Sequence, residues 1–145
     1  MNKNKSLSCF IVSFKQGFVS PNIPIASFHQ EEKDLNFLLD TGSDKNVIDE
    51  TALQQFEHKM LEPDENSTTH LSGVGGTKEV STCNLSFTCG DEQYTADFLV
   101  TDLKEAFGLV KRDHGITIHG ILGSAFLREN KVVLDFNSLA AYNKE

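Results

Sequence analysis

The run Leu35-Asn36-Phe37-Leu38-Leu39 constrains the fold of this chain most, because it is almost entirely apolar and ends abruptly in polar residues. Asp40-Thr41-Gly42-Ser43 follows it directly, and the chain turns apolar again at Val47-Ile48. The run predicts a buried strand. A carboxylate so close to buried residues is costly to ionise unless it is hydrogen-bonded, so the presence of Asp40 calls for an explanation.

The length of the chain, 145 residues, predicts a single domain over residues 1–145 with one hydrophobic core. Eleven Phe and no Trp indicate a core filled by Phe, Leu, Ile and Val. A net charge of -8 and a pI near 5.0 argue against nucleic acid or an anionic membrane as a partner, because both require a basic face.

The cysteines are Cys9, Cys83 and Cys89. Cys83 and Cys89 lie in one strand-like run, which places their Cα atoms roughly 20 Å apart, whereas a disulfide requires less than about 7 Å. We therefore expect reduced thiols and a cytoplasmic location. The basic residues 1–5 and the apolar residues 7–14 lack a small-x-small cleavage site, so we interpret them as part of the mature fold.

Strand-like runs dominate the chain and helical segments are few. We expect strands at Ser8–Phe14, Phe18–Phe28 (broken by Pro21 and Pro24), Leu35–Leu39, Val47–Ile48, Lys78–Cys89, Tyr94–Val100, Ile116–Ile118, Lys131–Phe136 and Leu139–Tyr142. We expect helices at Asp49–Met60, with Asp49 as N-cap, at Leu103–Val110, and at Ser124–Asn130, with Ser124 available as a cap. Gly90–Gln93 and Asn137-Ser138 are expected turns. The pattern predicts a mostly β domain with short helices, built as a barrel or a sandwich.

Three segments carry the functional signal. Asp-Thr-Gly alone is a weak signal, because it arises by chance in a chain of this length on the order of a few per cent of the time. A second segment, His119–Leu127 (HGILGSAFL), places two apolar residues between glycines before an expected helix. A glycine-rich hairpin, LSGVGGTKEV, lies between the two. Each segment alone is compatible with an ordinary turn or strand end, but the three together, in this order, indicate a function.

With these segments the sequence resembles the retropepsin-like aspartic proteases, single-domain relatives of pepsin, and most closely the bacterial stand-alone members. LLDTGSDKNVI looks like the first signature of the family, GILGSAFL followed by KVVLDF like the second, and LSGVGGTKEV like the flap. The resemblance covers about residues 18 to 142. It implies a closed, pepsin-like β-barrel, with the second signature passing beneath the active-site loop into a helix.

The resemblance implies an aspartic endopeptidase that cleaves peptides or unfolded protein segments. Asp40 is then the catalytic acid, Thr41 bonds across a two-fold axis, and Gly42 brings its N–H to the carboxylate. Because the sequence contains one Asp-Thr-Gly, a pair of catalytic acids requires two chains, so we expect a homodimer. Ser43 is expected to donate a hydrogen bond to Asp40 as well.

The expected substrate-binding residues are Ser43, Asp44, Gly73, Val74, Gly75 and Gly76. The glycines match no phosphate-loop pattern, so we interpret them as a flap over the substrate rather than a plain mobile hairpin tip. Family members often pair the acid at the position of Asp44 with an Arg, but here Ser124 and then Ala125 stand at those positions, and Arg128 is the remaining candidate.

The five histidines are scattered without metal-ligand spacing, so we expect no metal or other cofactor, and histidines at the surface or at caps. Two alternatives stay open beside the enzyme. In the first alternative, the chain has the same fold but is a catalytically silent binding module. In the second, it is an unrelated β-rich domain that contains Asp-Thr-Gly by chance.

Overall fold

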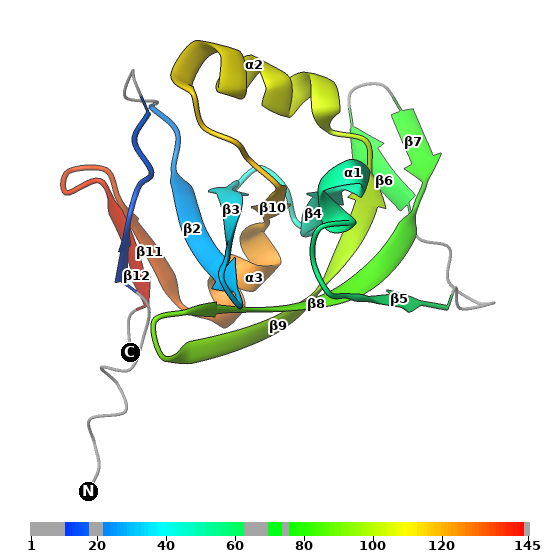
Figure 1. Ribbon diagram of the computed structural model, residues 1–145, viewed down its shortest axis with the longest axis horizontal. Coiled ribbons are helices and arrows are strands. Elements are labelled where there is room, and N and C mark those ends of the chain that lie inside the picture. Colours follow the sequence, from blue (N-terminus) through cyan, green and yellow to red (C-terminus); the bar gives the residue numbers. More distant parts are fainter. Residues whose placement is uncertain (1–10, 18–21, 63–69, 74–75, 144–145) are drawn as a thin grey trace, which may run out of the picture.

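The computed structural model of the chain describes residues 11–17, 22–62, 70–73 and 76–143 (Figure 1). The strands, in chain order, are β1 (Ile11–Ser13), β2 (Ile25–Gln30), β3 (Lys33–Leu39), β4 (Val47–Asp49), β5 (Lys59–Leu61), β6 (His70–Gly73), β7 (Gly76–Glu79), β8 (Ser81–Cys89), β9 (Glu92–Thr101), β10 (Gly120–Leu122), β11 (Val132–Asp135) and β12 (Ala140–Asn143). The helices are α1 (Glu50–Leu53), α2 (Lys104–His114) and α3 (Ser124–Glu129).

The main sheet closes on itself to form a barrel. Its strands are hydrogen-bonded in the order β2, β3, β10, β4, β9 and β8, and β8 pairs back to β2 where Thr88 lies opposite His29. β5 continues the sheet beyond β8. Closure leaves few unpaired strand edges. The predicted mostly β, closed barrel with short helices is confirmed.

One strand crossing determines how the barrel presents its polar loop. β3 and β4 follow one another in the chain, yet β10 lies between them, parallel to β3 and antiparallel to β4. The connection from β3 to β4, residues 40–46, must therefore pass over the end of β10. The loop that contains Asp-Thr-Gly thus rests on a strand from the far end of the sequence.

The interior of the barrel is filled by aromatic rings. Phe28, Phe37, Phe87 and Phe98 are at most 1% exposed and lie in edge-on, tilted or stacked contacts with centroids 5.1–6.1 Å apart. Phe126 of α3 joins them at 6.1 Å from Phe87. Each ring removes a large apolar area from water, so this cluster is the main source of stability.

Two smaller sheets are separate from the barrel, and α2 lies across one end of it (Figure 1). β1, β12 and β11 form a three-stranded sheet near both termini, and β6 pairs with β7 in a hairpin. Phe107 and Val110 of α2 pack on a second apolar cluster formed by Ile25, Ile116 and Ile118. Among the described residues, no helix is both long enough and apolar enough to cross a membrane.

The predicted strand at Ile116–Ile118 is wrong, because the strand lies further on, at β10. The two isoleucines alternate because they pack under α2 rather than because they pair with a neighbour. The carbonyl of Thr117 between them accepts its hydrogen bond from the Asn36 side-chain amide, at 2.6 Å, and not from a strand backbone.

The predicted helix at Asp49–Met60 is too long. Asp49 is the N-cap as expected, accepting from the Ala52 N–H at 3.0 Å, but the α-helix ends at Leu53. Beyond the helix, the backbone of Glu57 is bound by the side chain of Gln30 in β2. The Gln30 amide accepts from the Glu57 N–H at 2.7 Å and donates to the Glu57 carbonyl at 2.8 Å. A side chain distant in sequence therefore ends the helix.

The apolar cluster predicts a large difference between buried and exposed truncations. Phe37→Ala should lower the free energy of unfolding by about 3–5 kcal/mol, because it removes a fully buried ring from the barrel interior. Leu109→Ala on α2, where the side chain is 49% exposed, should change it by no more than about 0.5 kcal/mol. Urea unfolding of both variants checks this, and similar losses would contradict the assignment of the core.

Candidate active site

Asp40 is the first residue after β3, and its backbone is fixed by the neighbouring strand. Its N–H donates to the Leu122 carbonyl of β10 at 3.0 Å. Its carboxylate is half-buried, and Oδ1 accepts from the Gly42 N–H at 2.9 Å. In the part of the chain that the structure describes, no group donates to Oδ2. The carboxylate is thus held in place on one side and available on the other.

The residues after Asp40 form a tight turn. Thr41 and Gly42 are exposed at its tip, and the Ser43 N–H closes the turn by donating to the Asp40 carbonyl at 3.2 Å. The expectation that the Ser43 hydroxyl donates to Asp40 is wrong, because that hydroxyl donates to the Lys45 carbonyl at 2.7 Å. Ser43 therefore stabilises the loop and leaves the carboxylate to Gly42.

The second signature lies directly beneath this loop. The Ser124 N–H donates to the Ser43 carbonyl at 2.6 Å, and the Ala125 N–H to the Asp44 carbonyl at 3.4 Å. Ser124 is therefore the first residue of α3 rather than its side-chain cap; the N-cap position belongs to Gly123. A Cβ on Gly123 would lie 2.5 Å from the Lys45 carbonyl oxygen and 2.6 Å from that of Ser43. The loop and the strand can approach this closely because residue 123 has no side chain.

Asn46 joins the two signatures through its side chain, although nothing in its sequence context marks it for that role. Its Oδ1 accepts from the Gly123 N–H at 2.9 Å, and its Nδ2 donates to the Asp97 carbonyl of β9 at 3.1 Å. The available signal was an amide residue just before an apolar strand, which is too common to indicate a role.

A second acid, the last residue of β4, differs from Asp40 in its surroundings. Asp49 is 7% exposed, and its two carboxylate oxygens accept backbone N–H groups from Ala52 and Leu103, at 3.0 and 2.7 Å. A buried carboxylate with both oxygens bonded joins two segments of the fold. Of these two acids, Asp40 is the one with an oxygen left for chemistry.

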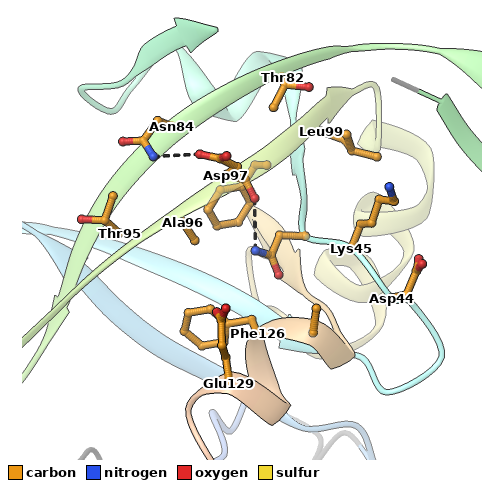
Figure 2. A pocket seen from close by; sticks show the side chains of 13 residues that line it. Asp44, Lys45, Thr82, Asn84, Thr95, Ala96, Asp97, Leu99, Phe126 and Glu129 are labelled. Carbon is orange, nitrogen blue, oxygen red and sulfur yellow. Dashed lines mark hydrogen bonds between the residues drawn. The ribbon is translucent and has the colours of Figure 1, made fainter. Parts of the chain in front are cut away.

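A groove of about 520 Å³ begins at the loop, on the side of Asp44 and Lys45 (Figure 2). Figure 2 shows β8 and β9 along one side, where the Asn84 amide donates to the Asp97 carboxylate at 2.8 Å, and Phe126 and Glu129 of α3 on the other. Asp44 is exposed. The ion pairs among the described residues are His29–Asp34 and Arg112–Asp113, so the pairing of Asp44 with Arg128 is not observed.

The expected flap is a hairpin as far as the structure describes it. β6 ends at Gly73 and β7 begins at Gly76, and these two residues are opposite one another in the register. Val74 and Gly75, which we also expected to bind substrate, lie outside the described residues.

His119 is buried, contrary to the expectation of surface or capping histidines. It is 8% exposed, and its Nδ1 accepts from the Asn36 N–H of β3 at 2.9 Å. Burial lowers the pKa of His119, while the charges of Asp34 and Asp49 act in the opposite direction. The neutral imidazole of His119, just before β10, therefore bonds to β3 at Asn36, which lies four residues before Asp40 in the chain.

Among the described residues, no group of His, Cys, Asp and Glu is placed to hold a metal ion. Cys83 and Cys89 are free thiols on β8, as predicted. Burial, with a smaller contribution from the charge of Asp97, raises the pKa of the Cys83 thiol to about 11, so it stays protonated and unreactive.

Comparison with known proteins agrees with this geometry. The family model described as aspartyl protease matches residues 26–126, which include the loop, the hairpin and the first part of the second signature, up to Phe126. The chain therefore belongs to the aspartyl protease family. Among solved structures, the EIAV protease complexed with the inhibitor HBY-793 shares the fold, with a TM-score of 0.50 and 22% identity over 74% of this chain and 86% of that one. A search of curated proteins found no match. Family and fold support aspartic protease activity in general.

The contact at Gly123 predicts opposite effects for two glycine substitutions. Gly123→Ala should lower the free energy of unfolding by about 1–3 kcal/mol or more, because its Cβ meets backbone oxygens that cannot move aside. Gly108→Ala, within α2 and with nothing near its Cβ, should raise it by roughly 0.5–1 kcal/mol. Denaturant unfolding measures both, and a neutral Gly123→Ala would argue against the close approach.

The buried imidazole predicts a loss of stability in acid. Because the folded-state pKa of His119 lies below its unfolded value of about 6.5, its contribution is complete above pH 6.5. That contribution is lost as the pH falls toward the folded pKa, since the unfolded chain takes up the proton first. His119→Asn, which keeps an acceptor for the Asn36 N–H and cannot titrate, should reduce the difference in unfolding midpoint between pH 7.5 and pH 5.5. An unchanged difference would exclude His119 as the cause.

Proposed function

We propose that the chain is an aspartic endopeptidase whose catalytic pair is formed by Asp40 from each of two identical subunits. The observation that carries this proposal is the state of Asp40, whose carboxylate has one oxygen bonded to Gly42 and the other without a donor among the described residues. It lies beside an exposed turn tip at Thr41 and Gly42. A second carboxylate can approach from that side. The sequence contains one Asp-Thr-Gly, which supports a pair assembled from two chains.

Two such carboxylates close together share one proton, because like charges in contact cannot both ionise readily. The pair titrates as a unit. The charged member takes a proton from a water molecule as that water attacks the scissile carbonyl, and the protonated member stabilises the oxygen that becomes charged. Hydrolysis then needs no covalent intermediate and no cofactor.

Thr41 and Gly42 serve the pair in different ways. Gly42 orients one carboxylate oxygen through its N–H and leaves the other for water. Thr41 is exposed beside the carboxylate, where its hydroxyl is available to the loop of the second subunit. In this proposal it holds the two loops at a fixed separation.

The proposed substrate is an extended peptide or an unfolded protein segment. The hairpin of β6 and β7, with Gly73, Val74, Gly75 and Gly76, folds over the peptide, and its backbone groups bond to the peptide backbone. Asp44 and Ser43 contribute to the adjoining substrate site, Ser43 by shaping the loop. The free thiols support a reducing, cytoplasmic compartment for this reaction.

Replacing the proposed catalytic acid tests the assignment. Asp40→Asn should lower kcat/KM for an unfolded protein substrate at mildly acidic pH by about 10²–10⁴-fold or more, because both the base and the acid of the pair are lost. Asp91→Asn, an exposed acid in the turn between β8 and β9, is the matched control and should retain the rate. Equal activity of Asp40→Asn and the unchanged protein would remove Asp40 from the mechanism.

Mixing the two proteins tests whether the pair spans two subunits. If unchanged chain and Asp40→Asn exchange freely, activity should fall as the square of the unchanged fraction, because mixed dimers hold a single acid. A linear fall would place the whole site in one chain. Sedimentation across a concentration range gives the mass independently. An inactive, monomeric wild-type chain would instead favour the silent binding module.

A further inference from the structure

Asn46 lies where the loop 40–46 ends and β4 begins, and it contacts two other parts of the barrel. Its side-chain oxygen accepts from the Gly123 N–H at 2.9 Å, and its side-chain nitrogen donates to the Asp97 carbonyl at 3.1 Å. Its own backbone carbonyl accepts from the Leu99 N–H at 2.9 Å. One residue thus connects the Asp40 loop to the second signature and to β9.

The two partners determine the orientation of the amide. Gly123 offers an N–H and therefore requires the oxygen, whereas Asp97 offers a carbonyl and requires the nitrogen. Among side chains of this length, neutral Asn alone supplies one donor and one acceptor in a rigid plane. The side chain is half-buried, so water substitutes poorly for the lost bonds when it is removed.

The position of these bonds connects Asn46 to Asp40. Asp40 is held at the start of the loop by its bond to Leu122, and Asn46 is held at the end by its bond to Gly123, the next residue along. The loop is therefore fixed at both ends on consecutive residues of β10 and its exit. Between these two bonds, the Ser124 and Ala125 N–H groups hold the backbone carbonyls of Ser43 and Asp44, and the tip at 41–42 is exposed. The Asn46 bond is therefore the side-chain contact among those that join the loop to the second signature.

We propose that Asn46 is a positioning residue, whose side chain fixes the loop 40–46 on the second signature and thereby sets where the Asp40 carboxylate stands. The inference rests on the proposed function for its consequence, since a pair of acids that must share one proton across a subunit boundary tolerates little displacement. A misplacement of about 1 Å at a reacting group costs on the order of 100-fold in rate.

The first test truncates the amide. Asn46→Ala should lower kcat on the order of 100-fold while the protein stays folded and dimeric by circular dichroism and sedimentation. The Gly123 amide should also exchange its hydrogen faster, because it has lost its acceptor. Asn130→Ala is the matched control: the half-buried Asn130 amide also donates to a backbone carbonyl, that of Phe126, at 2.9 Å, but lies outside the loop and the groove, so this variant should keep the full rate.

The second test uses protonation to restore the amide pattern. In Asn46→Asp, a charged carboxylate still accepts from Gly123 but repels the Asp97 carbonyl. Once protonated, it supplies both an acceptor and a donor. Its rate relative to the unchanged protein should therefore recover as the pH falls toward about 4, whereas that of Asn46→Ala should stay low at every pH. A residue that merely stabilised the fold would not produce this difference between the two variants.

Three results separate the possibilities. If the unchanged protein is an active protease and Asn46→Ala keeps its kcat, the positioning inference is overturned. The same holds if Asn46→Ala loses activity only in proportion to its unfolded fraction, or if the relative rate of Asn46→Asp does not recover in acid. If the unchanged protein is inactive, the proposed function fails, and the Gly123 amide exchange still tests the bond itself.

Discussion

The structure depends on the close approach between the loop 40–46 and the end of β10. Backbone N–H groups of residues 123–125 point at this loop, and their acceptors are the Asn46 side chain and the carbonyls of Ser43 and Asp44. Buried backbone groups must be paired, so the loop and the strand complete one another's hydrogen bonding. The absence of a side chain at Gly123 is what permits the distance. Through this contact, β10 lies between β3 and β4 and completes the ring of strands.

The same contact explains why two acids, at the ends of strands that follow one another in the chain, differ in what their carboxylates bind. Asp49 lies between α1 and the segment before α2, and each presents an N–H group to it. One carboxylate oxygen accepts from Ala52 and the other from Leu103, so neither is left over. At Asp40, its own N–H donates to the Leu122 carbonyl of β10, the Ser43 N–H donates to the Asp40 carbonyl, and the Gly42 N–H is the donor to the carboxylate. An acid becomes available for chemistry here because the surrounding backbone is satisfied without it.

The strand before Asp40 and the turn after it could be predicted from the sequence, because neighbouring residues determine them. The apolar run at 35–39 and the Asx-type turn after it have short-range physical causes. The glycines at 120 and 123 are visible in the sequence as a pattern, although the backbone that requires them lies more than 70 residues away. The errors share a different origin. Gln30 shortens the first helix, α2 covers the isoleucines that resemble a strand, and Asn46 gains its meaning from Gly123 and Asp97. In each case, the deciding partner is distant in sequence, and no local window contains it.

His119 adds a constraint on how such a site can operate in acid. A pair of acids that shares one proton works best where half of its charge is retained, which favours mildly acidic conditions. His119 joins the same two strands that hold Asp40, and its bond to Asn36 exists while the ring is neutral. Protonation converts that acceptor into a donor facing another donor. If the proposed pair of acids operates, the acid limb of its rate profile contains two events, titration of the pair and loss of the bond from the Asn36 N–H to His119. Loss of the bond to Asn36 requires an imidazole at position 119, whereas titration of the pair does not. The part of the acid limb that persists after His119 is replaced therefore belongs to the carboxylates.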